Sequence, residues 1–244
     1  MITIFRKIRQ SLISENKFKN YLVYAIGEII LVVIGILIAL SINTCNQNRI
    51  NNNKEIYYLN QLKQELTNQN EEINKRLERS ANSIKVVDTL LSQLYKDGKF
   101  TASSELNGNL FQLIGGTNFK LFRTTFDELI STGQFTLISS DSLRSKILFC
   151  YQEIEKSKND ITNNSENVFY KDIFPALNAS INFQYPEHIS DLFIAELNSP
   201  KEQLRLAKAI SLNKLNLWSY QKALKDCQDE VTSTIDMIDA LLSL

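Results

Sequence analysis

Few side chains in this sequence have the type and spacing that catalysis requires. Histidine occurs once, at His188, directly after Pro186-Glu187. A single histidine does not complete a zinc site or a Ser–His–Asp triad, so hydrolases and metalloenzymes lose their usual base. The sequence also contains no G-x-S-x-G, P-loop, H-E-x-x-H or C-x-x-C motif. We therefore predict no enzyme activity, no metal and no cofactor, with His188 as a surface or interface residue.

The three cysteines are the remaining nucleophilic groups. Cys150 and Cys227 occupy apolar positions of predicted helices, which favours two buried free thiols, with a structural disulfide as the alternative. Cys45 lies nearer the amino terminus, where it could cross-link two chains. The adjacent carboxylates Asp127-Glu128 do not face each other on a helix, so we assign them to helix capping and not to acid–base catalysis.

Glu28 is the one carboxylate in an apolar run from Leu22 to Ile42. An ionisable group in such a run is by default a candidate functional residue. On a helix, Glu28 shares a face with the small residues Gly35 and Ala39, which allow a second helix to approach closely. We predict that this face contacts another membrane protein or a second copy of the chain, with a protonated Glu28 satisfied by the partner. Alternatively, Glu28 snorkels to the inner headgroups. The face comprises Ala25, Glu28, Val32, Gly35 and Ala39.

The apolar run predicts a transmembrane helix. Its 21 residues would form a helix of about 31 Å, which matches the hydrocarbon core of a bilayer. Fourteen of them are Leu, Ile or Val, and their summed insertion free energy of about 6 kcal/mol exceeds the roughly 3 kcal/mol cost of one acidic group. A cleaved signal peptide is the alternative, because Ala39-Leu40-Ser41 resembles a cleavage site. The long segment before the run favours an uncleaved anchor.

The flanking charges predict an orientation for this helix. Residues 1–20 contain five basic residues against Glu15, a net charge of +4, whereas residues 43–58 contain only Arg49 and Lys54 as basic residues. The positive-inside rule then places the amino terminus in the cytoplasm and the chain after residue 43 outside it. Apolar residues interleave with the basic ones, so we predict an amphipathic arm on the inner leaflet. The basic residues of this arm are Arg6, Lys7, Arg9, Lys17 and Lys19.

The opening of the chain, residues 4–43, resembles the start of the bacterial DUF6090 family of uncharacterised membrane proteins. The likeness is carried by AIGEI at residues 25–29 and VVIGILIAL at residues 32–40, and more weakly by residues 126–148. The chain departs from the family pattern at residues 42–49, INTCNQNR, where the family tends to carry a tryptophan. The resemblance implies no assigned activity. It implies a single-pass protein of the bacterial inner membrane with a periplasmic helical domain.

The sequence predicts long helices, because the whole chain contains only 7 glycines and 3 prolines. One helix is expected from Glu55 to about Lys96, ended by Asp97-Gly98, and a second opens at Ser199-Pro200. We predict an all-α fold in which one transmembrane helix precedes an extracytoplasmic bundle built on these two antiparallel helices, with shorter helices between them. The expected divisions are an arm (1–20), a transmembrane helix (21–42), a juxtamembrane linker or helix continuation (43–54) and a helical domain (55–244).

Local signals predict the shorter helices and the buried faces. Residues 125–128 form a capping box for a helix that stops at Thr132-Gly133, and Ser139 or Ser140 caps the next helix. Residues 115–118 form a turn.

The central aromatic residues are expected in the core, with a ligand pocket as the alternative; they are Phe119, Phe122, Phe126, Phe135, Phe149 and Tyr151. The expected buried stripe of the last helix is Leu204, Ala207, Ile210, Leu215, Trp218, Leu224, Cys227, Val231, Ile235, Ile238 and Leu242.

The charge balance bears on the class of partner. The whole chain has a net charge of 0, and the predicted exported part, at about −3, has no basic surface for nucleic acid. We predict a membrane-anchored interaction or accessory protein that acts through non-covalent contacts with the bilayer and with other proteins. The alternatives are an extracytoplasmic small-molecule or stress sensor that signals through a partner, and a secreted helical protein after signal cleavage.

Overall fold

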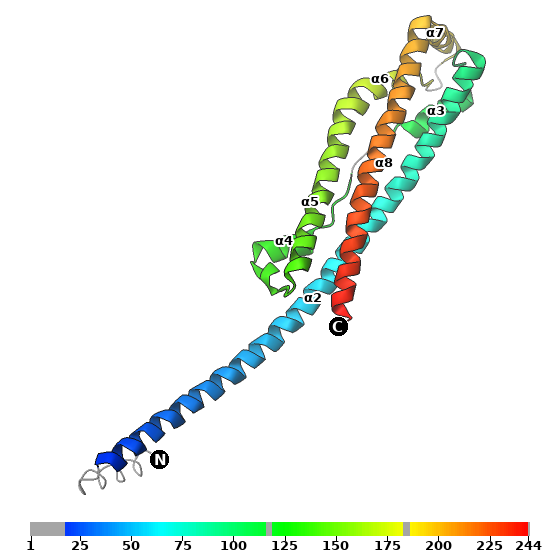
Figure 1. The fold of residues 1–244 in the computed structure, drawn as a ribbon. Coiled ribbons are helices and arrows are strands. Elements are labelled where there is room, and N and C mark those ends of the chain that lie inside the picture. Colours follow the sequence, from blue (N-terminus) through cyan, green and yellow to red (C-terminus); the bar gives the residue numbers. More distant parts are fainter. Residues whose placement is uncertain (1–17, 116–118, 183–185, 244) are drawn as a thin grey trace. The chain divides into compact units, whose positions relative to one another are not determined.

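The computed structural model describes residues 18–115, 119–182 and 186–243, and every regular element in these ranges is a helix. The predicted all-α fold, with one apolar amino-terminal helix followed by further helices, is confirmed. The chain divides into two compact units, Met1–Ile56 and Tyr57–Leu244, and α2 contributes residues to both. In chain order the elements (Figure 1) are α2 (Phe18–Asp97), α3 (Ser104–Leu113), α4 (Thr124–Ser131), the 3-10 helix η1 (Gln134–Leu137), α5 (Asp141–Asn164), the π-helix η2 (Ser165–Ile173), α6 (Phe174–Ala179), α7 (Glu187–Leu197) and α8 (Pro200–Leu242).

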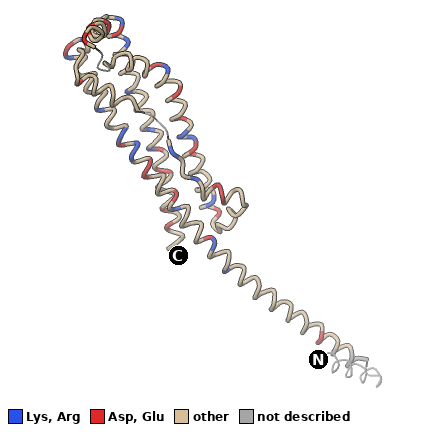
Figure 2. Tube along the Cα trace, turned by 180° about the vertical axis from the view of Figure 1, so that it is seen from behind, with Lys and Arg blue, Asp and Glu red and all other residues tan. Residues whose placement is uncertain are grey.

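In the first unit, α2 carries an apolar stretch over residues 22–42. Its most apolar window of 18 residues has a mean hydropathy of 2.8, and none of that window is buried. No charged residue lies between Glu28 and Arg49, so α2 is tan over residues 29–48 in Figure 2. Among the described residues, α2 is the one helix long and apolar enough to cross a membrane. A membrane anchor and a signal sequence both have this property. The helix continues through residues 43–54.

The second unit is built on residues 57–97 of α2 together with α5 and α8 (Figure 1). The ammonium group of Lys63 lies 2.6 Å from a carboxylate oxygen of Asp239. Further along α2, Asp88 lies 2.6 Å from the ammonium group of Lys214. Residue numbers therefore rise along α2 as they fall along α8. The predicted antiparallel pairing of the two long helices is confirmed.

Two apolar clusters form the core of this unit. One lies among α2, α4, α5 and α8, and the other involves α2, α3, η2, α6 and α8. The first buries Leu59, Leu62, Leu66, Ile73, Leu129, Ile147, Ile154, Leu224, Val231 and Ile238, among others. The second buries Val87, Leu90, Leu106, Leu110, Phe169, Ile173, Leu177, Leu206 and Ile210, among others. No fully apolar layer joins them along α2 and α8, because polar residues are buried between the two sets.

The predicted buried stripe of α8 is wrong in the part of the helix that lies between the two apolar clusters. Leu215 and Trp218 are 58% and 50% exposed, whereas Asn213 is only 3% exposed. The buried face passes through Asn213, which a search for apolar residue types skips. Leu204 is also exposed. The physical reason is that residues 210, 213 and 217 share one side of the helix, and the asparagine holds a core position on that side.

The central aromatic residues mostly follow the core prediction. Phe119, Phe126 and Tyr151 are buried, and Phe135 packs against the first cluster. Phe149 is the exception, because it lies on the solvent side of α5 and is 49% exposed.

Most predicted helix ends are confirmed. Gly98 follows α2 with a φ of +72°, a left-handed conformation that glycine adopts without strain. Ser199 precedes Pro200, and its hydroxyl caps the first turn of α8. Ser140 caps α5 by accepting from the N–H of Leu143 at 3.2 Å. Gly133, with a φ of +69°, follows α4.

Two elements differ from the sequence expectation. The helix α3, capped by Ser103, was not predicted. The π-helix η2, which continues directly from α5 into α6, was not predicted either. Of the turn expected at residues 115–118, residues 116–118 lie outside the described residues.

Candidate functional site

The contact face predicted from the sequence lies on α2, in the first unit. Ala25 and Glu28 are half-buried, and Val32, Gly35 and Ala39 are exposed. A Cβ atom added at Gly35 meets nothing within 4 Å in the described part of the chain. The helix surface around Gly35 is therefore open to close approach by a second helix.

The other residues singled out in the sequence are distributed as follows. Of the basic arm, Lys19 lies in the first turn of α2. Arg6, Lys7, Arg9 and Lys17 lie outside the described residues. His188 is exposed on α7, and no group of three or more metal-ligating side chains occurs among the described residues.

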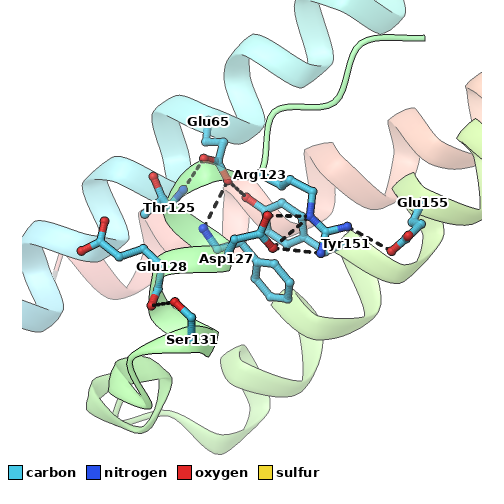
Figure 3. A network of polar contacts seen from close by, with 9 residues as sticks. Glu65, Arg123, Thr125, Asp127, Glu128, Ser131, Tyr151 and Glu155 are labelled. Atoms are coloured by element: carbon cyan, nitrogen blue, oxygen red, sulfur yellow. Dashed lines mark hydrogen bonds and ion pairs between the residues drawn. The ribbon is translucent and has the colours of Figure 1, made fainter.

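A buried carboxylate joins α2, α4 and α5 in the second unit (Figure 3). Glu65 of α2 is 8% exposed. Its Oε2 accepts a hydrogen bond from the backbone N–H of Thr125 at 2.7 Å, and its Oε1 accepts from the N–H of Phe126 at 3.5 Å. The hydroxyl of Tyr151 also donates to Oε1. Glu65 therefore caps the first turn of α4 from another helix, and both of its oxygens are engaged.

The capping box predicted at residues 125–128 is wrong. The helix α4 begins at Thr124, with Arg123 at the N-cap position and no side-chain cap. Glu128 does not turn back to the helix start; its Oε1 instead accepts a hydrogen bond of 3.0 Å from the Tyr58 hydroxyl of α2. The long-range carboxylate of Glu65 instead accepts from the N–H groups of Thr125 and Phe126.

Tyr151 connects this polar junction to the apolar core. Its ring stacks on Phe126 with a centroid distance of 4.0 Å and an interplanar angle of 13°. Burial, together with the neighbouring Glu65, raises the pKa of Tyr151 well above its ordinary value, so the hydroxyl stays protonated and donates. On the outer side, Arg123 pairs with Asp127 at 2.9 Å and with Glu155 at 3.0 Å. The geometry stabilises the docking of α4 on α2 and α5.

Cys150 and Cys227 are buried free thiols in the first core cluster, as predicted. Burial raises the pKa of Cys150 to about 11 and that of Cys227 to about 12. Because the thiolate is the reactive form, both thiols are poor nucleophiles at neutral pH. Cys45 is free and exposed.

These features define a class of protein: an all-α chain with one largely exposed apolar helical stretch and a helical bundle. The chain belongs to DUF6090, a family of unknown function, which it matches over residues 28–172. This confirms the resemblance seen in the sequence. The match begins inside the apolar stretch, includes the α4 junction and ends in η2, so α8 lies beyond it. Comparison with curated proteins and with solved structures gives no match.

Proposed function

We propose that this protein is a membrane-anchored helical interaction or accessory protein. The apolar stretch of α2 carries the proposal. Its large apolar side chains between residues 22 and 42 are each 46% to 74% exposed. The surface of a soluble monomer rarely presents a contiguous apolar patch larger than a few hundred Å². A bilayer, in contrast, accommodates a helix that is apolar on all sides.

The proposed location is a bacterial inner membrane, with residues 1–20 in the cytoplasm and the second unit in the periplasm. The asymmetry of basic residues on the two sides of the apolar stretch supports this orientation. The basic arm would lie against anionic headgroups of the inner leaflet. Uncleaved retention of the stretch is part of the proposal, because a secreted product would lose the anchor.

The proposed mode of action is non-covalent contact through the helix in the membrane. The face containing Glu28 and Gly35 combines a carboxyl group with small residues, which suits a helix–helix contact with another membrane protein or with a second copy. A polar side chain in hydrocarbon gains most when a partner satisfies it, so Glu28 would select the partner and the small residues would set the close distance.

Site-specific photo-cross-linking in cells tests this mode of action. A benzophenone amino acid at Ala39 lies on the proposed face, and the same group at Leu37 lies on the opposite side of the helix. We expect one discrete cross-linked product from position 39 and none from position 37. The second variant is Gly35→Leu in the chain that carries the benzophenone at position 39. Its Cβ atom has open space around it, so loss of the product there would report on the partner.

Equal cross-linking from both faces, or a product from position 39 that survives both Gly35→Leu and Glu28→Leu, would contradict the proposed contact. The mass of a specific product distinguishes a second copy from a different protein. A control without ultraviolet light identifies products that do not depend on the photo-cross-linking group.

A further inference from the structure

A cavity in the second unit lies where the two apolar clusters fail to meet. Its volume is about 290 Å³, close to the lower end of the range for small-molecule sites. It is enclosed by α2, the end of α3, α5 with the start of η2, and α8. All of its lining residues belong to the second unit.

Polar side chains converge on this cavity because of helical spacing. On α2, Arg76, Ser80 and Ser83 are separated by three or four residues and so share one face. On α8, Asn213 and Tyr220 lie seven apart on the side that faces the cavity. A bundle core at this level would ordinarily be apolar, so the concentration of polar groups here needs a separate explanation.

One of these polar groups is buried and has no partner. Ser80 is 2% exposed, and its hydroxyl makes no hydrogen bond in the described part of the chain. Asn213, on the other long helix, is 3% exposed and lines the same cavity. A buried hydroxyl without a partner costs roughly 1–3 kcal/mol. A ligand that bonds to the Ser80 hydroxyl would remove that cost.

The charges around the cavity favour an anion of charge −1. Arg76 and Arg79 line the cavity, and no Asp or Glu is found among its described lining residues. Arg76 is already paired with Glu72 at 2.7 Å and lies beside the Tyr220 hydroxyl. Arg79 has no ion pair among the described residues, which leaves one uncompensated positive charge. Two further charged groups, Lys75 and Glu78, flank Arg79 in an adjoining surface hollow and offset each other.

Apolar side chains also line the cavity. They include Leu113, Ile161, Phe169 and Leu217. Ser165 and Phe169 lie in the first half of the π-helix η2, and such wide turns are frequent at functional sites. The site therefore combines donors and a guanidinium group with apolar side chains that an apolar body can contact.

We propose that this cavity binds a small monocarboxylic acid with an aliphatic or aromatic body. The carboxylate pairs with Arg79 and accepts hydrogen bonds from the side chains of Ser80 and Asn213. The body of the acid packs against the apolar side chains of the cavity. A phosphate dianion would leave excess negative charge in the site. The site is independent of the membrane contact. A ligand bound there would be the signal that a sensor protein detects.

Binding to the full-length protein in mild detergent tests the proposal. The probes are acetate, benzoate, phenylacetate and octanoate, with phenylacetamide as the uncharged counterpart and inorganic phosphate as the counterpart without a body. We expect saturable binding of at least one of the three larger carboxylates by equilibrium dialysis, accompanied by a rise in melting temperature. Phenylacetamide and phosphate should bind at least tenfold more weakly than the best carboxylate.

Arg79→Gln removes the uncompensated charge from an exposed position, so the fold should be retained. We expect the affinity for the best carboxylate to fall at least tenfold. Lys85→Gln removes one positive charge from an exposed position of the same helix outside the cavity and should leave the affinity unchanged. Asn213→Leu keeps the shape of the side chain and removes its amide from the cavity lining, so it should weaken binding.

Three results would overturn the proposal. These are the absence of saturable binding by every carboxylate in the series, equal affinity in the Arg79→Gln and Lys85→Gln variants, and tighter binding of phosphate than of any carboxylate. A circular-dichroism melting curve of each variant confirms that the bundle is folded in the assay.

Discussion

The two parts of α2 arrange their apolar side chains in different ways. Between residues 22 and 42 the apolar side chains surround the helix and are exposed. From residue 57 onward they form one stripe, which includes the buried Leu59, Leu62 and Leu66, and the remaining positions are largely polar. The same secondary structure thus meets two different needs. A helix apolar on all sides suits lipid, and a striped helix suits a bundle with one face in water.

This difference shows that helix formation alone says little about environment. In the bundle, stability comes from burial of the stripe against α5 and α8. In the first unit, no burial among the described residues accounts for the apolar side chains. If the difference is as we describe, identical substitutions in the two parts should have unlike consequences for the stability of the bundle.

The largest expected contrast is between two leucine truncations in α2. Leu62 is 0% exposed and Leu37 is 59% exposed. Leu62→Ala should destabilise the bundle by about 2–5 kcal/mol, through lost burial and a residual cavity. Leu37→Ala should change it by less than about 0.5 kcal/mol. Thermal or chemical unfolding of the full chain, followed by circular dichroism, measures both; similar losses would contradict the difference between the two parts.

A smaller loss is expected at the buried carboxylate. Glu65→Gln keeps the size of the side chain but removes the charge and one acceptor from the N–H groups of Thr125 and Phe126. The bundle should lose about 2 kcal/mol, the typical value for hydrogen bonds to a charged group. Glu71→Gln, at an exposed position of the same helix, is the matched control. A Glu65→Gln variant as stable as this control would show that the cap contributes nothing measurable.

The cysteines provide a chemical comparison of the two units. Iodoacetamide at pH 8 should modify the exposed Cys45 readily and leave the buried Cys150 and Cys227 unmodified until the chain is denatured, as read by peptide mass spectrometry. Folding raises the pKa of Cys150 from its ordinary 9.0 to about 11, so its protonated thiol favours the folded state below pH 9. This contribution should disappear as the pH rises from about 9 to about 11, and Cys150→Ala should reduce the alkaline loss of stability. Rapid native modification of Cys150 would contradict its burial.

The smallest effect is expected at a surface ion pair. Lys63 and Asp239 are 40% and 45% exposed, so solvent screens their attraction. Lys63→Gln should shift the unfolding free energy by less than about 1 kcal/mol. A loss larger than that of Glu65→Gln would mean that the contact between α2 and α8 depends on charge more than on the buried stripe.

The sequence predicted those parts of the fold that depend on local signals. The carboxyl end of α2 follows from Asp97-Gly98, because glycine adopts a left-handed backbone conformation without strain. The start of α8 follows from Ser199-Pro200, because the fixed φ of proline suits the first turn of a helix. The antiparallel pairing then follows from two long helices in one compact unit. The apolar run at residues 22–42 is likewise readable from residue types alone.

The features that were missed depend on contacts between distant segments. Glu65 caps α4 from 60 residues away, and nothing at Thr125 or Glu128 signals that the local box is displaced. The cavity was missed because its buried polar residues, Ser80 and Asn213, interrupt the apolar stripes. A polar residue at the expected core spacing on both long helices was the available signal, and the search for apolar residue types passed over it.

The most direct test of the central claim is the intact mass of the protein recovered from the membrane fraction after an alkaline carbonate wash. We predict that the protein remains in the pellet and that its mass includes residues 22–42. A protein released by the wash, or a mature chain that begins after Ser41, would contradict the membrane anchor.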